Sequence, residues 1–246
     1  MAPFPMLRTD IKAVFLDAGS TLFTHRRSRP ETYLAIAQEH GLPELEIDTI
    51  EASMQHAFLD LPDTVDGNFR YSLAWFWAFN QRVMTEVGMP EGKLEGAHHA
   101  LLEYFADPST YTLFPEVPEV LETLSNHNMQ MGVVSNWSEH LPELLQALGI
   151  ADHFSFIVTS ADLRTEKPGR AIFERALFRA GVAAEETVHT GDHFERDVRG
   201  ALNAGMRAVW LDRTGESGPD REGVPVIPEL NGLIGLLEAQ PNAVRT

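Results

Sequence analysis

Short apolar runs alternate with stretches of helical periodicity along most of the chain. The runs are rich in β-branched and aromatic residues and are too short for helices, so they predict buried strands. The stretches between them are bounded by proline, asparagine or glycine, which are common helix start and stop signals. This alternation predicts an α/β fold with a three-layer, doubly wound parallel sheet. The predicted strands are 12–17, 129–136, 153–160, 186–192 and 207–212, and the predicted helices between them are 115–127, 138–148 and 168–180.

The segment 24–109 interrupts this alternation, because it contains several amphipathic stretches and no convincing strand. An all-helical insertion is therefore predicted after the first strand. The α/β core is then formed by residues 1–23 and 110–246. The helices expected within the insertion are 31–40, 47–59, 71–87 and 92–105.

The third helix of the insertion carries an aromatic stripe. Its members repeat at the spacing of one helix face, which predicts that they form the core of the insertion rather than a ligand-binding box. The stripe consists of Ser72, Phe76, Phe79 and Val83, and it is flanked by Trp75 and Trp77.

Composition and charge narrow the possible partners. The 246 residues carry a formal net charge of −17, which disfavours binding to nucleic acid or to anionic membrane surfaces. No apolar run approaches the ~18–20 residues that span a bilayer. The chain contains no cysteine, which excludes disulfides and thiolate metal sites. The first ten residues, with two prolines and charged side chains, do not resemble a signal peptide, so a cytoplasmic protein is expected.

Polar side chains gather where the predicted strands end. Ligands of open parallel sheets bind beyond the carboxyl ends of the strands, so these residues are expected to lie near one another. Singly, Asp192, Ser135 and Asn136 could each be a helix cap. Jointly, the set indicates a binding or catalytic site. Its members are Asp17, Ser135, Asn136, Lys167, Asp192 and Asp197.

Four segments resemble, in order, the motifs of the haloacid dehalogenase-like hydrolase superfamily. Residues 17–21 (DAGST) are similar to the first motif, Ser135 to the second, Lys167 with Pro168 to the third, and residues 191–197 (GDHFERD) to the fourth. The run 191–213 is the most specific part of the match. The order fits the subgroup that inserts a helical cap after the first motif. The resemblance implies a Rossmann-like core with an all-helical cap.

The resemblance also implies a chemistry for these residues. Asp17 is the expected nucleophile, and Mg²⁺ is expected to be held by Asp17, the backbone carbonyl of Gly19 and Asp192. The phosphoryl oxygens would be bound by Thr21, Ser135, Asn136 and Lys167. Asp197 is expected to orient Lys167 or a metal-bound water. The expected partner is a small phosphorylated substrate, bound by a monomer or a homodimer.

One position departs from the phosphatase pattern. Phosphatases of this superfamily resemble DxDxT, with a second Asp as general acid and base, and Gly19 stands at its place. Loss of a positioned acid/base costs about 10²–10⁴ in rate. A phosphohydrolase could act on a good leaving group, or His25 or His193 could replace the missing acid.

Two other functions remain open. The chain could be a non-catalytic binder of phosphate or metal, or a metal-independent 2-haloacid dehalogenase, which needs no such acid. The fourth motif favours the phosphohydrolase, and the binder ranks ahead of the dehalogenase. Arg26, Arg27 and Arg29 follow the first motif and are best explained as solvated charges of a linker, although one of them could face an anionic substrate. Phe69, Arg70 and Tyr71 could also reach the pocket.

Overall fold

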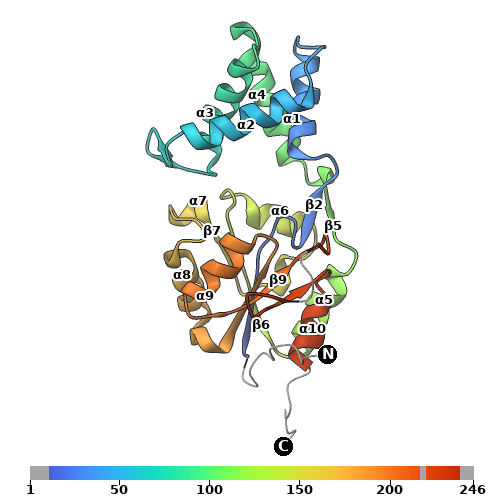
Figure 1. Ribbon diagram of the computed structural model, residues 1–246, viewed down its shortest axis with the longest axis vertical. Coiled ribbons are helices and arrows are strands. Elements are labelled where there is room, and N and C mark those ends of the chain that lie inside the picture. The colour runs from blue at the N-terminus through green and yellow to red at the C-terminus, as the bar shows by residue number, and fades with distance from the viewer. Residues whose placement is uncertain (1–10, 217–219, 239–246) are drawn as a thin grey trace, which may run out of the picture. The chain divides into compact units, whose positions relative to one another are not determined.

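The protein consists of two compact units in a computed structural model that describes residues 11–216 and 220–238 (Figure 1). The α/β unit comprises residues 1–24 and 113–246, and the helical unit comprises residues 25–112. The first ten residues, which underlie the expectation that no signal peptide is present, lie outside the described part. None of the described helices is long and apolar enough to cross a membrane.

The main sheet confirms the predicted α/β class. Among the described residues it has seven strands in the order β10-β11-β9-β8-β1-β6-β7, and all neighbours are parallel except β10 and β11. The strand order reverses direction around β1, which is the arrangement of a doubly wound sheet. The strands are β1 (Ala13–Leu16), β6 (Gln130–Ser135), β7 (Phe156–Thr159), β8 (Thr187–Gly191), β9 (Arg207–Leu211), β10 (Asp220–Arg221) and β11 (Val224–Ile227).

Helices cover both faces of this sheet. Figure 1 shows α8 and α9 on one side and α5 and α10 on the other. Every residue of β1 is buried, as expected for a central strand with both faces covered. The helical elements of the unit are α5 (Val117–Asn126), α6 (Leu141–Ala147), η2 (Ala151–His153), α7 (Ser160–Leu163), α8 (Arg170–Ala180), η3 (Ala184–Glu186), η4 (Phe194–Arg199), α9 (Gly200–Asn203) and α10 (Gly232–Glu238).

Several short elements are absent from the sequence-based prediction. The hairpin of β10 and β11 extends the sheet beyond β9. Two further strands, β2 (Phe23–His25) and β5 (Tyr111–Leu113), pair with each other where the chain leaves and re-enters the α/β unit. Strands of two or three residues have too few side chains for a recognisable alternating pattern, and Pro225 interrupts the four-residue run of β11.

The helical unit contains the four predicted helices and a small hairpin that was not expected. All of residues 25–112 are described. Ser28 starts the first helix with a capping box, because its hydroxyl accepts from the Glu31 amide and Glu31 accepts from the Ser28 amide. The elements are α1 (Arg29–Glu39), α2 (Ile47–Asp60), β3 (Thr64–Val65), β4 (Asn68–Phe69), α3 (Leu73–Glu86), α4 (Glu91–Ala106) and η1 (Pro108–Thr110).

The buried face of α3 differs from the predicted stripe. Trp75 is fully buried and stacks on Phe79 at 5.4 Å between ring centroids, and its indole N–H donates to the carbonyl of Pro62 at 3.0 Å. Ser72 lies outside the helix and caps it by accepting from the Trp75 amide. Trp75 therefore takes the place on the buried face that the prediction gave to Ser72. The prediction that the stripe forms core is confirmed at Phe79 and Val83, which are buried.

A buried polar chain crosses the core of the helical unit. The hydroxyl of Tyr33 donates to Asn80 Oδ1, and the Asn80 amide donates to His98 Nδ1 at 3.0 Å. Because Nδ1 accepts a hydrogen bond, His98 is neutral with its proton on Nε2. Burial, and secondarily the neighbouring His99, lowers the pKa of His98 to about 4.

This pKa predicts an acid-sensitive helical unit. The unfolded chain takes up a proton at His98 below about pH 6.5, whereas the folded chain resists protonation until about pH 4, so stability falls as the pH decreases through this window. Urea unfolding at about pH 7 and about pH 5 measures the effect. His98→Gln should reduce the dependence on pH, and His140→Gln, at an exposed histidine of the α/β unit, is the control. An equal pH dependence in the native and His98→Gln proteins would contradict the assignment.

Candidate active site

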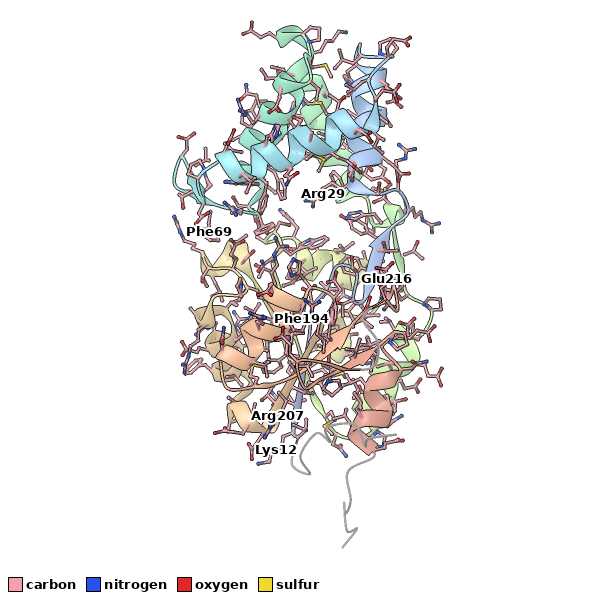
Figure 2. All side chains as sticks on the ribbon, in the orientation of Figure 1. Lys12, Arg29, Phe69, Phe194, Arg207 and Glu216 are labelled. Atoms are coloured by element: carbon pink, nitrogen blue, oxygen red, sulfur yellow. The ribbon has the colours of Figure 1, made fainter. Side chains whose placement is uncertain are left out.

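The fold brings the predicted site residues to the carboxyl ends of the strands. Asp17 follows β1, Ser135 ends β6, and Asp192 follows β8. In Figure 2, Lys12 and Arg207 mark the amino ends of β1 and β9, whereas Phe194 lies toward the opposite edge. The carboxyl ends of these strands therefore form one edge of the sheet, and ligands of parallel sheets bind at this edge.

Lys167 lies between two of the carboxylates. Its Nζ is 2.7 Å from Asp17 Oδ1 and 2.5 Å from Asp197 Oδ1, and all three side chains are buried. Burial by itself would lower the pKa of Lys167, but the charges of Asp17 and Asp197 and their hydrogen bonds outweigh it and raise that pKa. The lysine is therefore an ammonium ion fixed beside the candidate nucleophile.

Asp197 is the most constrained acid of the site. Its Oδ1 also accepts from His189 Nε2 at 3.1 Å, and its Oδ2 accepts from the His193 amide at 2.9 Å. Burial opposes ionisation, yet Lys167 and His189 hold the pKa of Asp197 well below its usual range. Gly191 makes room for it, because a Cβ at that position would lie 2.3 Å from Asp197 Cγ.

Three carboxylates form a cluster that fits a hard cation. One oxygen each of Asp17, Asp192 and Asp197 lies within 4.8 Å of the others. Burial, followed by the charges of Asp17 and Asp197, raises the pKa of Asp192 to about 7. The single positive charge of Lys167 does not neutralise the three carboxylates, so the cluster retains negative charge. Carboxylate oxygens are also the ligands that Mg²⁺ prefers. The donor set therefore suits the divalent cation that the sequence motifs imply.

Asn136 fixes the loop that carries Lys167. Its Nδ2 donates to the Lys167 carbonyl at 3.0 Å, and its Oδ1 accepts from the Lys167 amide at 2.8 Å. The capping alternative is wrong for Asn136, because His140 stands at the N-cap of α6. It is also wrong for Asp192, because His193 caps η4 by accepting from the Arg196 amide.

Arg213 holds the loop that follows β1, which the sequence did not reveal. Its Nε donates to the Ser20 carbonyl at 3.0 Å and its Nη2 to the Thr21 carbonyl at 2.9 Å. The guanidinium also pairs with Glu116 at 2.8 Å and lies 3.4 Å from the centroid of the Phe114 ring. Five donors in a rigid fork suit such a multiple contact. Arg213 thereby fixes the backbone directly after Asp17.

The remaining predicted residues of the α/β unit differ in their surroundings. Thr21 is fully buried, and its hydroxyl has no hydrogen-bond partner among the described residues. Ser135 is buried and pairs in register with Thr159 of β7. His193 uses its ring nitrogen as the cap of η4. His189, which the sequence did not single out, joins the network through Asp197.

The candidates from the insertion make contacts within the helical unit. Arg29 lies over the rings of Phe76 and Phe105, and Arg70 lies over Phe58 and pairs with Asp63. Burial and the charge of Arg29 lower the pKa of His25 to about 4. Of the others, Arg26 donates to the Ser109 carbonyl, Arg27 lies over Tyr104, Phe69 belongs to β4, and Tyr71 is buried.

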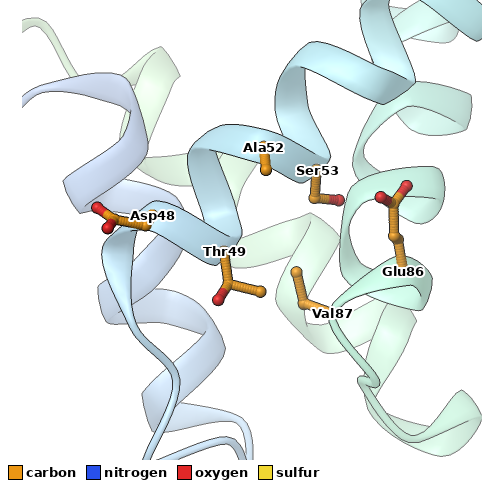
Figure 3. Close-up of a pocket in the computed structure, with 6 residues that line it drawn as sticks. All are labelled: Asp48, Thr49, Ala52, Ser53, Glu86 and Val87. Atoms are coloured by element: carbon orange, nitrogen blue, oxygen red, sulfur yellow. The ribbon is translucent and has the colours of Figure 1, made fainter.

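The helical unit also contains a pocket of about 390 Å³ between α2 and α3 (Figure 3). It has two carboxylates in its lining and no cationic side chain, so it does not suit an anionic substrate. None of the strand-end residues lines it. The lining consists of Asp48, Thr49, Ala52, Ser53, Glu86 and Val87.

Sequence comparisons show the family that the motifs resemble. Residues 75–211 match the family described as haloacid dehalogenase-like hydrolase. The chain is 32% identical over 212 residues to haloacid dehalogenase-like hydrolase domain-containing protein 3 of Danio rerio, covering 84% of this chain and 87% of the relative. It is 36% identical over 146 residues to a phosphoserine phosphatase of Thermus thermophilus, covering 57% of each chain.

Solved structures of two activities share the fold. A HAD phosphatase from Thermococcus onnurineus superposes with a TM-score of 0.67 at 24% identity, covering 94% of this chain and 99% of the other. A 2-haloacid dehalogenase from Pseudomonas syringae pv. Tomato superposes with a TM-score of 0.67 at 26% identity, covering 93% and 98%. Phosphatase and dehalogenase thus both occur among similar proteins.

The geometry of Lys167 predicts a large stability effect. Lys167→Met leaves the buried Asp17 and Asp197 without their ammonium counter-ion, which should lower the free energy of unfolding by about 3–5 kcal/mol. Adding Asp197→Asn should recover part of the loss. Urea unfolding measures both, and Lys12→Met, which removes an exposed ion pair with Glu186, serves as the control. A loss no larger than that of the control would show that Lys167 does not compensate these acids.

Proposed function

The chain belongs to the haloacid dehalogenase-like hydrolase family, and we propose that it is a phosphohydrolase that uses Asp17 as its nucleophile on a small phosphorylated metabolite. The observation that carries the proposal is the position of Lys167, which fixes Asp17 and Asp197 beside Asp192 at the carboxyl edge of the sheet. Phosphatases among its relatives support this choice.

In the proposed reaction, Asp17 attacks phosphorus and forms an aspartyl-phosphate. Because Lys167 binds Asp17 Oδ1, the other carboxylate oxygen is assigned to the attack. The bond from phosphorus to the leaving oxygen breaks, and the leaving group departs with the electron pair. Water then attacks phosphorus, frees the Asp17 carboxylate and releases its proton to solvent. The hydroxyl of Ser135 and the ammonium of Lys167 are assigned to the phosphoryl oxygens.

Asp17, Asp192 and the backbone carbonyl of Gly19 would hold Mg²⁺ in this proposal. The ion would supply positive charge that allows an anionic phosphoryl group to approach a carboxylate. Asp197 acts through Lys167 rather than on the substrate, since its oxygens bind Lys167, His189 and the His193 amide.

The helical unit is proposed to be a cap for this site. The chain enters it through β2, a few residues after Asp17. Caps exclude water and supply selectivity. One of the arginines near its start, Arg26, Arg27 or Arg29, is the proposed contact for an anionic substrate.

The proposal includes partners and location. A small molecule is the expected partner, because a net charge of −17 opposes polyanionic partners. The proposed location is the cytoplasm, with which the absence of cysteine is compatible. The proposed oligomeric state is a monomer or a homodimer.

A metal-independent dehalogenase is another candidate, favoured by a similar solved structure and by the absence of an acid at position 19. In that reaction a halide leaves carbon without a proton, and Asp192 has no assigned use. A non-catalytic binder would use the same carboxylates and lysine without turnover.

A phosphoenzyme is the expected signature of the proposed function. With p-nitrophenyl phosphate and Mg²⁺, a burst of about one equivalent of p-nitrophenol should precede slow turnover, because no base at position 19 activates the water. Asp17→Asn should remove the burst and lower the rate by about 10³-fold or more. The exposed Asp152→Asn should leave both unchanged.

Two results would replace this assignment. Chloride release from 2-chloropropionate without Mg²⁺, lost in Asp17→Asn, would identify a dehalogenase. Binding of Mg²⁺ or phosphate in calorimetry, without turnover of p-nitrophenyl phosphate, acetyl phosphate or 2-chloropropionate, would identify a binder.

A further inference from the structure

The side of the nucleophile loop at Gly19 is filled by an indole ring. A Cβ built on Gly19 would lie 2.9 Å from Trp137 Cζ3 and 3.7 Å from two further ring atoms. The φ angle of Gly19 is not in the left-handed region, so its backbone is open to other residues. The ring of Trp137, rather than a backbone requirement, is therefore the obstacle to a side chain at position 19, and the ring would have to shift to admit one.

Trp137 is held in this place from several directions. Its ring packs edge-on against Phe23, with centroids 5.4 Å apart and an interplanar angle of 89°. Its carbonyl accepts from Ser160 Oγ and from the Ala161 amide, both at 3.3 Å. The preceding residue, Asn136, is fastened to the Lys167 backbone by two hydrogen bonds. A side chain at position 19 would have to displace a ring that packs in this framework.

We propose that Trp137 determines the substrate class of the site, by holding an aromatic surface where a proton donor to the leaving group would otherwise stand. The site then acts on phosphoryl donors whose leaving group departs as a stable anion, acyl phosphates in particular. This inference rests on the proposed phosphohydrolase function.

The proposed step balances without a proton donor. An Asp17 oxygen bonds to phosphorus, the bond from phosphorus to the acyl oxygen breaks, and the carboxylate leaves with the electron pair and remains ionised. An alkoxide leaving group would need a proton at this moment. Neither Gly19 nor Trp137 has a titratable group to supply one.

The steric part of the proposal is tested by a double-mutant cycle that needs no activity. Gly19→Ala should lower the urea midpoint of the native protein and should have little effect in a Trp137→Leu background, because the smaller side chain leaves room for the methyl group. Trp137→Phe gives a second background if Trp137→Leu does not fold. An equal effect of Gly19→Ala in all backgrounds would overturn the steric coupling.

The chemical part is tested by the dependence of rate on the leaving group. Acetyl phosphate, p-nitrophenyl phosphate, phenyl phosphate and glycerol 2-phosphate form a series of rising leaving-group pKa. The native enzyme should lose kcat/KM steeply along it. Gly19→Asp alone should not gain activity on glycerol 2-phosphate, whereas Gly19→Asp with Trp137→Leu should gain at least about 10-fold and give a shallower dependence.

The outcomes separate this inference from the function on which it rests. If no member of the series forms a phosphoenzyme at Asp17, the proposed function and the leaving-group inference both fail. If phosphoenzyme forms but the native rate is independent of the leaving group, only the inference fails. A full gain from Gly19→Asp alone would also overturn it, because Trp137 would then not be the obstacle.

Discussion

The burial of one ammonium group between two carboxylates determines how the rest of the site is arranged. Lys167 and Asp17 are 150 positions apart in sequence and 2.7 Å apart in space. Taking charged groups out of water is costly, so the arrangement is stable only when each charge keeps partners. Asn136 fixes the lysine backbone, His189 and the His193 amide satisfy Asp197, and Gly191 allows Asp197 to approach. The loop that carries Lys167, the carboxyl end of β1 and η4 are therefore held together by these charges and hydrogen bonds.

Much of the fold could be predicted from the sequence, because its main elements have strong patterns. The apolar strands of the parallel sheet and the amphipathic helices carry enough residues for their period to be visible. The hairpin of β10 and β11 and the paired strands β2 and β5 do not show such a period in the sequence. The face of α3 was misjudged because Ser72 matched the apolar period by position, while its hydroxyl was needed at the helix start.

The site was predictable where its residues follow a strand end or belong to a motif. Topology brings Asp17, Ser135 and Asp192 to one edge of the sheet, whereas Lys167, in the loop before α8, and Asp197, in η4, were grouped with them through the motifs they resemble. His189 lies inside an apolar strand, and nothing in a strand pattern tells a buried polar partner from a core residue. Arg213 acts through hydrogen bonds to backbone carbonyls, and Trp137 occupies the space in which a Cβ of residue 19 would lie. Neither contact follows from the spacing of residue types along the sequence. Their roles depend on three-dimensional approach.

The charge balance of the site separates the candidate reactions on physical grounds. Three carboxylates face one ammonium group, and the pKa of Asp192 is raised to about 7 by burial and by the other two acids. An anionic phosphoryl group entering such a site meets net repulsion unless a cation compensates it. A monoanionic haloacid that reacts at carbon needs no extra carboxylate, and Asp192 would only oppose its binding. The acids gathered around Lys167 thus favour a reaction that recruits a divalent cation, even though the position beside the nucleophile, filled by Trp137, lacks an acid that could protonate an alkoxide leaving group.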